Sequence, residues 1–238
     1  DIQNFSCLFT TSSYIDFAES MGDSTATYPL QFIWTRGGKN YYVLQPFDFR
    51  KDSLNRQQIM EKIQNTKNQF YGFFLDWMSF LIMSPLDDVP PAADVHFKKD
   101  SVFVNYATVE EGITAEVEKI FLPSGRLVRV EVKTGNQKII NYPLYEEHGG
   151  KWLCMGWDTQ IYIDDQVTSG LSTRIELRDI AGYRFPSRAD VVVQTIEKPE
   201  DKFLSIIFLK DYQINQALQE LPLPASATDS LAADRQRE

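Results

Sequence analysis

Apolar and polar residues alternate along the second half of the chain, from Val95 to Asn215. The segments GRLVRVEVK, GLSTRIELRD and GITAEVEKIF each place apolar side chains at every second position, with polar or charged ones between them. A period of two is typical of strands with one dry face and one wet face. Turn sequences that contain glycine separate the runs, at 111–112, 123–125, 134–136, 149–150, 169–170 and 181–182. The pattern predicts an antiparallel meander of seven or eight strands that ends with Phe203–Asn215.

A helical pattern precedes the meander. The stretch from Asp52 to Phe70 contains neither proline nor glycine, and the residues of one face recur at helical spacing. The residues of that face are Ile59, Ile63, Thr66 and Phe70. The stretch predicts an amphipathic surface helix, with Asp52 or Ser53 as its N-terminal cap.

The next segment, Phe70–Met83, is far more apolar, because eleven of its fourteen residues are large and apolar or aromatic. On a helical wheel Gly72, Asp76, Ser79 and Met83 form one narrow stripe, so we expect a helix buried around most of its circumference. It serves as a core helix, as the wall of a ligand cavity, or as both. We expect Asp76 to face solvent or a helix terminus, and the sharper alternative is a buried carboxyl group that binds a proton.

The first fifty residues predict β-structure of their own. Gly37 and Gly38 separate the runs Tyr28–Trp34 and Lys39–Phe47, which is a hairpin signal, and Asp16–Thr27 has the composition of a loop. We therefore expect an α+β fold with a large curved antiparallel β-sheet, a half-barrel-like meander, wrapped around one or two helices. Its expected parts are an N-terminal β-rich extension packed on the main sheet (1–51), the helix pair with the half-barrel (52–219) and a flexible tail (220–238).

Charge and composition narrow the possible partners. The 238-residue chain has a net charge of −9 and no basic run, which argues against nucleic acid and anionic membrane surfaces as primary partners. Cys7 and Cys154 either form one long-range disulfide or remain two separate thiols. The opening residues DIQNFSCLFTT do not form a signal peptide, which fits a mature secreted chain or a cytoplasmic one.

The sequence contains no recognisable catalytic or cofactor motif. His96 and His148 are its two histidines, and we expect both to be ordinary rather than catalytic. A zinc site needs about four nitrogen or sulfur ligands, so we expect neither a metal nor a cofactor. The acidic doublets at 87–88, 110–111, 146–147 and 164–165 fall in or beside predicted turns. We therefore expect a protein that is not an enzyme.

The aromatic content suggests a candidate ligand cavity, since binding pockets are mostly aliphatic and aromatic. In the strand KWLCMGW we expect Leu153, Met155 and Trp157 on one face, and Trp152 and Cys154 on the other. The expected cavity lining comes from this strand and the apolar helix: Phe70, Phe73, Phe74, Trp77, Phe80, Leu81, Leu153, Met155 and Trp157.

Two later segments, PSGRLVRVEV (Pro123–Val132) and IAGYRFPSRADVVV (Ile180–Val193), are similar to strand-turn-strand steps of the LolA/LolB-type lipoprotein carriers. The resemblance extends from Asp52 to Asn215. It implies a half-barrel that shields lipoprotein acyl chains, in a monomer that is periplasmic or secreted after removal of a signal peptide. Transient contact with a membrane or an envelope protein is also implied. The first fifty residues depart from the family pattern, and the arginine that closes the cavity in these carriers has no identified counterpart, so no site residue is carried over.

These observations leave three functions open. The leading hypothesis is a non-catalytic cell-envelope protein that binds or carries a lipid, a lipoprotein or another hydrophobic ligand between sheet and helices. The first alternative is an interaction protein of the envelope with a solid core and an exposed edge or patch that meets a partner. The second alternative is a hydrolase that uses dispersed Asp and Glu residues.

Overall fold

The computed structural model describes residues 2–21, 27–38, 40–45, 53–110, 112–196 and 200–217 of the chain, without the side chains of 53–55 and 110. The expected cap at Asp52 or Ser53 and the expected tail at 220–238 lie outside this description.

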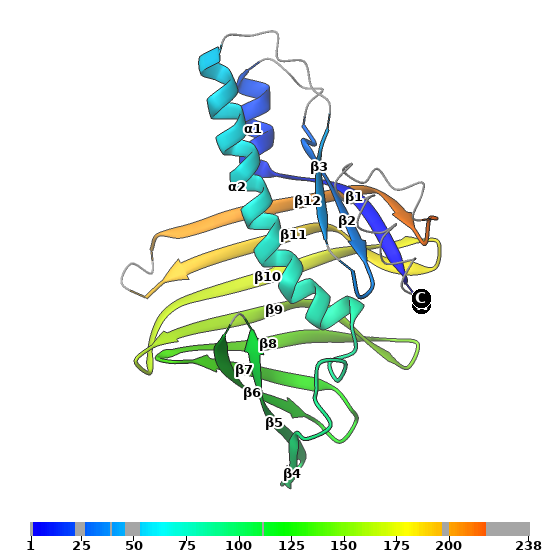
Figure 1. Ribbon diagram of the computed structural model, residues 1–238, viewed down its shortest axis with the longest axis vertical. Coiled ribbons are helices and arrows are strands. Elements are labelled where there is room, and N and C mark those ends of the chain that lie inside the picture. Colours follow the sequence, from blue (N-terminus) through cyan, green and yellow to red (C-terminus); the bar gives the residue numbers. More distant parts are fainter. Residues whose placement is uncertain are drawn as a thin grey trace. The chain divides into compact units, whose positions relative to one another are not determined.

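The strands of the described residues form one open antiparallel sheet of twelve (Figure 1). Their order is β3-β2-β1-β12-β11-β10-β9-β8-β7-β6-β5-β4. The strands are β1 (Asn4–Thr11), β2 (Leu30–Thr35), β3 (Tyr41–Leu44), β4 (Asp94–Lys98), β5 (Ser101–Glu110), β6 (Ile113–Phe121), β7 (Leu127–Thr134), β8 (Gln137–His148), β9 (Lys151–Ile163), β10 (Gln166–Ile180), β11 (Tyr183–Thr195) and β12 (Lys202–Ile214). The helices are α1 (Ser12–Ser20), α2 (Ser53–Trp77) and the π-helical turn η1 (Met78–Ile82). The prediction of a large antiparallel sheet with helices is confirmed.

Two details of the predicted meander are wrong. From β4 to β12 the described chain forms nine strands, where seven or eight were expected. The expected turn at 169–170 lies inside β10, and the chain turns instead at Asp164 and Asp165, whose φ angles are 50° and 61°. A further turn joins β4 to β5, with Lys99 at φ 54°. Aspartate tolerates the left-handed region, so the turn at Asp164 and Asp165 forms without the glycine signal that guided the prediction.

The chain divides into two compact units. Unit 1 contains residues 1–73, 178–188 and 206–238, and unit 2 contains 74–177 and 189–205. The N-terminal strand β1 pairs with β2 on one side and with the C-terminal strand β12 on the other, which brings the two ends of the described chain into unit 1.

Unit 1 is built around buried aromatic side chains. Phe5 and Phe9 of β1 are fully buried, as is Phe70 of α2. The Phe70 ring stacks on that of Phe9 with centroids 4.0 Å apart and meets Phe32 of β2 at 5.0 Å. Ile63, Thr66 and Phe70 share the buried face of α2, which confirms the predicted amphipathic helix.

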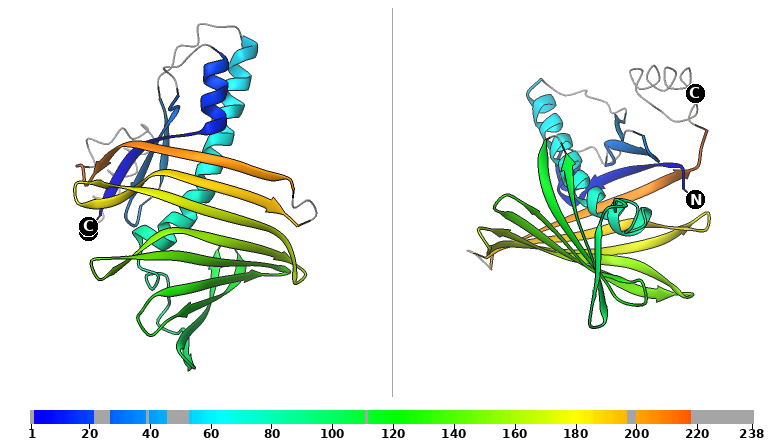
Figure 2. Two further views of the ribbon diagram at one scale, coloured as in Figure 1. Left: turned by 180° about the vertical axis from the view of Figure 1, so that it is seen from behind. Right: turned by 60° about the horizontal axis from the view of Figure 1, so that its bottom comes forward.

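One expectation for this unit is wrong in part, because Asp16–Ser20, the first residues of the segment expected to be a loop, are helical. Residues Ser12–Ser20 form α1, which lies beside the first half of α2 (Figures 1 and 2). The side-chain oxygen of Thr11 caps α1 by accepting a hydrogen bond from the Tyr14 backbone N–H. The same hydroxyl lies 3.3 Å from that of Thr66 on α2, so a single threonine starts one helix and joins it to the other.

Unit 2 has one inner face, defined by two rows of side chains that the strand register places opposite one another. Residues opposite each other on neighbouring strands share a face of the sheet. The first row is Val95, Val104, Lys119, Val130, Asn141 and Thr159. The second row is Tyr106, Val117, Val132, Ile139 and Ile161. The end of α2 and the turn η1 pack against this face, where the Phe80 ring meets that of Trp157 at 5.4 Å.

A β-bulge changes the expected faces of the segment KWLCMGW. Tyr145 of β8 pairs with Cys154, whereas its neighbour Leu144 pairs with Gly156, so Met155 is an extra residue in β9. The extra residue shifts the alternation by one position. Cys154 therefore lies on the same face as Trp157, and the prediction that they lie on opposite faces is wrong.

We expect the substitution Phe70→Ala to lower the free energy of unfolding by about 3–5 kcal/mol, because it leaves a cavity among stacked rings. Tyr71 is the matched control, since it is the next residue of the same helix and is 50% exposed. Tyr71→Ala should cost less than about 1 kcal/mol. Urea denaturation of both variants checks this, and equal losses would contradict the packing described for unit 1.

The bulge generates a second prediction. Gly156 has φ 149°, and a Cβ atom there would lie far inside contact distance of the Thr173 carbonyl oxygen. Gly156→Ala should therefore destabilise the fold by roughly 2 kcal/mol or more. Gly170→Ala, whose Cβ would lie 3.6 Å from the Thr159 carbonyl oxygen, should be nearly neutral. Thermal unfolding of the pair distinguishes a required glycine from a tolerated one.

Candidate functional site

A cavity of about 310 Å³ lies in unit 2, between the helical segment Leu75–Phe80 and the inner face of the sheet. The helical side contributes Leu75, Asp76, Ser79 and Phe80. The sheet side contributes Tyr106, Thr108, Val117, Lys119, Leu127, Val130, Val132 and Asn141, and the connector contributes Asp88. The strands β5–β8 supply these residues at every second position, apart from Leu127, which lies at a register shift between β6 and β7.

Of the residues expected to line a cavity, Phe80 is the one that lines this cavity. Phe74, Trp77 and Trp157 are almost fully buried in the packed part of unit 2. Phe70 and Phe73 are buried in unit 1. The remaining three, Leu81, Leu153 and Met155, are half-buried in unit 2 and are not among the lining residues. Eight of the nine residues are therefore not part of the lining of this cavity.

The sheet-side lining was missed because its signal is weak. Val117, Val130 and Val132 stand between charged residues in GITAEVEKIF and GRLVRVEVK, and alternation alone marks them as the dry face of a strand. It does not show whether the dry face meets packed side chains or a cavity. That distinction depends on where the helical segment lies, which is a tertiary property.

Asp76, expected to face solvent or a helix terminus, lines the cavity instead. Burial raises the pKa of its carboxyl group to about 6, and a hydrogen bond from the Trp157 indole N–H offsets part of that effect. A carboxyl group in this environment titrates near neutral pH, so its proton can respond to a bound ligand. The Asp76 side chain is half-buried, and its raised pKa matches the proton-binding part of that alternative.

A cationic side chain, Lys119, lies on the otherwise apolar inner face and is buried. Its ammonium group forms an ion pair with Asp88 and donates a hydrogen bond of 2.8 Å to the Pro85 carbonyl oxygen. The Tyr106 hydroxyl donates to the other carboxylate oxygen of Asp88 at 2.7 Å. We call this group of four residues the lysine clamp, because it ties the connector after η1 to strands β5 and β6.

The clamp sets the charge state of its members. Burial alone would raise the pKa of Asp88, but the hydrogen bonds from Lys119 and Tyr106 outweigh burial and hold that pKa below its ordinary value. Burial, and then the bond to Asp88, raise the pKa of the Tyr106 hydroxyl. Both carboxylate oxygens of Asp88 therefore accept hydrogen bonds within the clamp. Asp76, the other carboxyl group that lines the cavity, is not part of the clamp.

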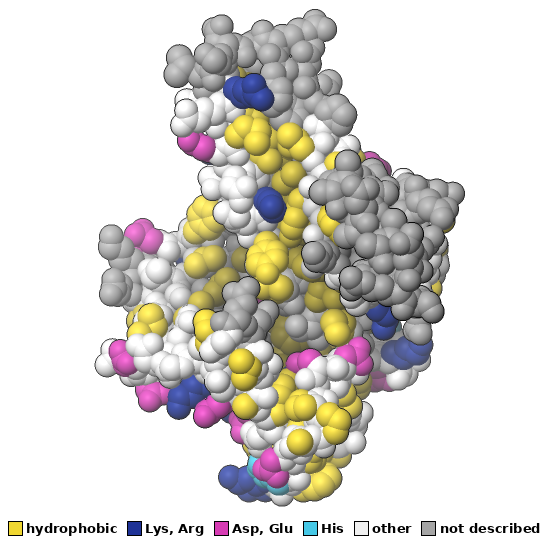
Figure 3. Space-filling model, viewed as in Figure 1, with side chains coloured by type: hydrophobic (Ala, Val, Ile, Leu, Met, Phe, Trp, Pro, Cys, Tyr) yellow, Lys and Arg dark blue, Asp and Glu magenta, His cyan; other side chains and the backbone are white. Residues whose placement is uncertain are grey.

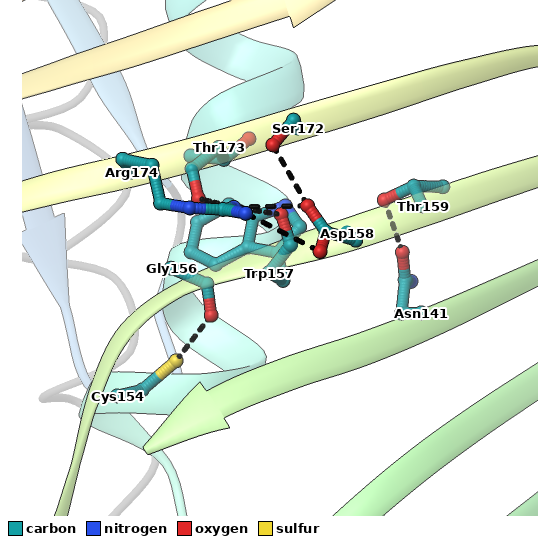
Figure 4. A network of polar contacts seen from close by, with 9 residues as sticks. All are labelled: Asn141, Cys154, Gly156, Trp157, Asp158, Thr159, Ser172, Thr173 and Arg174. Atoms are coloured by element: carbon teal, nitrogen blue, oxygen red, sulfur yellow. Dashed lines mark hydrogen bonds and ion pairs between the residues drawn. The ribbon is translucent and has the colours of Figure 1, made fainter. Parts of the chain in front are cut away.

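Polar contacts around the bulge fix the strands next to the cavity (Figure 4). On the face opposite the cavity, Arg174 forms an ion pair with Asp158 at 2.9 Å, and Ser172 donates a hydrogen bond to the same carboxylate. On the inner face Thr159 donates to Asn141, which orients an amide that lines the cavity. The Cys154 thiol donates to the Gly156 carbonyl oxygen at 3.1 Å, and burial raises its pKa to about 11, so it is an unreactive thiol.

A second hollow, of about 480 Å³, lies on the outer face of β5–β7. Its lining is largely charged and includes Glu116, Glu118, Arg129, Glu131 and Lys133. Arg129 is already paired with Glu131 and lies 3.8 Å from Glu118. We therefore take the inner cavity, whose lining combines apolar side chains with a similar number of polar ones, as the candidate site.

Three observations bear on other kinds of site. Among the described residues, no group of three or more histidine, cysteine or acidic side chains is placed to hold a metal ion. Cys7 and Cys154 are both free and buried. Within the described part of the chain, none of the helices has the length and hydropathy needed to cross a membrane.

Comparisons with protein-family models, curated proteins and solved structures found no match to this chain. The candidate site therefore stands on its own geometry.

The raised pKa of Asp76 predicts a pH-dependent effect of removing its charge. The folded-state pKa of about 6 lies above the ordinary value of 3.8, so between these values the folded chain keeps a proton that the unfolded chain releases. The stability linked to this proton is present below about pH 4 and is lost as the pH rises through 6. Asp76→Asn should therefore stabilise the fold by roughly 2–3 kcal/mol at about pH 7.5 and by little at about pH 4.

Urea denaturation across this pH range measures the difference between Asp76→Asn and the parent chain. Glu147→Gln, which removes an exposed carboxylate from β8, is the control and should leave the pH dependence unchanged. A stability difference for Asp76→Asn that is the same at every pH would show that the carboxyl group is solvated.

Proposed function

We propose that this chain is a non-catalytic binding protein that holds a small hydrophobic ligand, such as a single acyl chain, in the cavity of unit 2. The observation that carries the proposal is the lining of that cavity. Its sheet-side wall includes Val117, Leu127, Val130 and Val132, and Phe80 closes it from the helical side. The branched aliphatic side chains, together with the aromatic rings of Phe80 and Tyr106, suit the apolar part of a ligand, since binding is driven by burial of apolar surface.

The polar groups of the cavity suit a ligand with one polar end. Asp76 and Asn141 are fixed by Trp157 and Thr159 respectively, so they present oriented hydrogen-bonding groups. A volume of about 310 Å³ is near the lower limit of ligand pockets, which span about 300–1,000 Å³. The size favours one short chain over the several acyl chains of a lipoprotein anchor.

The LolA/LolB-type resemblance supports the wider form of the proposal. In that form the sheet is half-barrel-like, and the protein acts in the periplasm or outside the cell, where it exchanges its ligand with a membrane or an envelope protein. The cavity between a helical segment and the inner face of an antiparallel sheet is compatible with this form. The binding proposal itself requires only the cavity.

One observation favours the hydrolase alternative. Asp76 and Asp88 line the same cavity, and their environments move their pKa values in opposite directions, as in many acid–base pairs. We place this function second because Lys119 and Tyr106 occupy both oxygens of Asp88. A carboxylate that already accepts these hydrogen bonds, and whose pKa is lowered by them, is a weak general base for activating a water molecule.

Filling the cavity tests the binding proposal. Val130→Trp places a large side chain in the space, and the dissociation constant for decanoic acid should rise about tenfold or more. Val109→Trp is the matched control, because Val109 lies on β5, is 68% exposed and is not among the lining residues. Isothermal titration calorimetry measures binding, and circular dichroism checks that both variants fold. No binding by the parent chain, or equal binding by both variants, would sink the proposal.

A further inference from the structure

Strand β4 has an open edge. It is the last strand of the sheet order, and among the described strands it pairs with β5 alone. Alternate residues of such a strand direct their N–H and C=O groups away from the sheet. All five residues, Asp94–Lys98, are exposed. The edge is therefore available for pairing with another strand.

The exposed edge is also apolar on one face. Val95 and Phe97 pair with Val104 and Val102 of β5, so they continue the inner face of unit 2 to its rim. Phe97 is 78% exposed and Val95 is 51% exposed. Hydrophobic side chains are visible on the surface over β4 and its neighbours in Figure 3, viewed as in Figure 1. An aromatic residue exposed to this degree on a free edge is costly unless something covers it.

The sequence of β4, DVHFK, is complementary to itself in antiparallel pairing. With His96 at the centre, Asp94 lies opposite Lys98 of a second strand, and Val95 lies opposite Phe97. Each pair occurs twice. The apolar pairs fall on the inner face, and the oppositely charged pairs fall on the other face beside His96. The strand thus presents matching charge, matching apolar surface and free hydrogen-bonding groups in one register.

We propose that two copies of this chain form a dimer by antiparallel pairing of their β4 strands. The two-fold axis of this dimer passes between the two His96 residues. The contact is isologous and closes on itself, so it yields a dimer rather than a filament. This goes beyond the ligand-binding function and does not depend on it. The family resemblance implies a monomer, whereas this proposal implies a dimer that forms as the protein concentration rises.

The neighbouring residues limit this edge to one register. In parallel pairing each Asp94 would lie beside the Asp94 of the other copy. In antiparallel pairing shifted by one residue, Val95 would lie opposite His96, and the Val95–Phe97 pairs would be lost. Pro90 and Pro91, a few residues before the strand, lack backbone N–H groups and prevent the pairing from extending in that direction. A five-residue strand makes a small interface, so the dimer is weak.

Charge exchange tests the proposal, because Asp94 and Lys98 are exposed and their substitution leaves the interior unchanged. Asp94→Lys opposes two lysines in each cross-strand pair, and Lys98→Asp opposes two aspartates. Each variant alone should associate at least about tenfold more weakly than the parent chain. A mixture of the two variants restores Asp–Lys pairs at both positions and should form a heterodimer.

Sedimentation velocity of the full chain, from roughly 10 μM to 1 mM, suits an interface of this size. The expected result is a dimer for the parent, monomers for each variant and a dimer for the mixture. Phe97→Asp removes the apolar pairs and should also give a monomer, while Glu147→Gln on β8 should behave as the parent. A parent chain that stays monomeric to 1 mM would overturn the proposal. So would a dimer that the charge variants leave intact, because it would use another surface.

Discussion

The buried ammonium group of Lys119 is the constraint on which the site in unit 2 depends. A cation on the inner face of a sheet, in a row with valines, is costly unless it is paired and hydrogen-bonded. The chain meets this requirement with Asp88 and the Pro85 carbonyl oxygen, both in the connector that follows η1. Satisfying the lysine therefore holds the connector on the sheet, next to the helical segment that covers the inner face.

The cavity follows from how that covering segment is held. Packing of Phe80 against Trp157 fixes the segment over β9, and the clamp fixes the connector over β5 and β6. The valines between these attachments line the cavity instead of packing against other side chains. The bulge at Met155 contributes to this arrangement, because it places Trp157 on the inner face, where its indole N–H reaches Asp76.

Much of the fold was predictable because local patterns determine it. The alternation in GRLVRVEVK and GITAEVEKIF predicted the strands, and the buried face of α2 was predicted from Ile63, Thr66 and Phe70. The turn at Asp164 and Asp165 was predicted too late in the chain, at 169–170, because aspartate adopts the left-handed conformation without a glycine signal. The faces of KWLCMGW were misassigned because a bulge depends on the register with β8, which a single strand does not reveal.

The site was less predictable than the fold, for a related reason. Hydrophobicity identified the most apolar residues, such as Trp77 and Trp157, and these are the ones that pack completely. The cavity is lined instead by medium-sized side chains and by polar residues such as Asp76 and Asn141. A single sequence shows which residues avoid water, but it does not show which of them lack a packing partner.

The central claim is that the cavity of unit 2 holds an apolar ligand, and native mass spectrometry of the freshly purified chain tests it most directly. The account predicts a discrete excess mass that organic extraction releases as one small hydrophobic molecule per chain. If the protein carries no such mass, incubation with a short-chain fatty acid should produce it. A chain that stays at its own mass in both experiments would contradict the account and favour an interaction protein with no ligand.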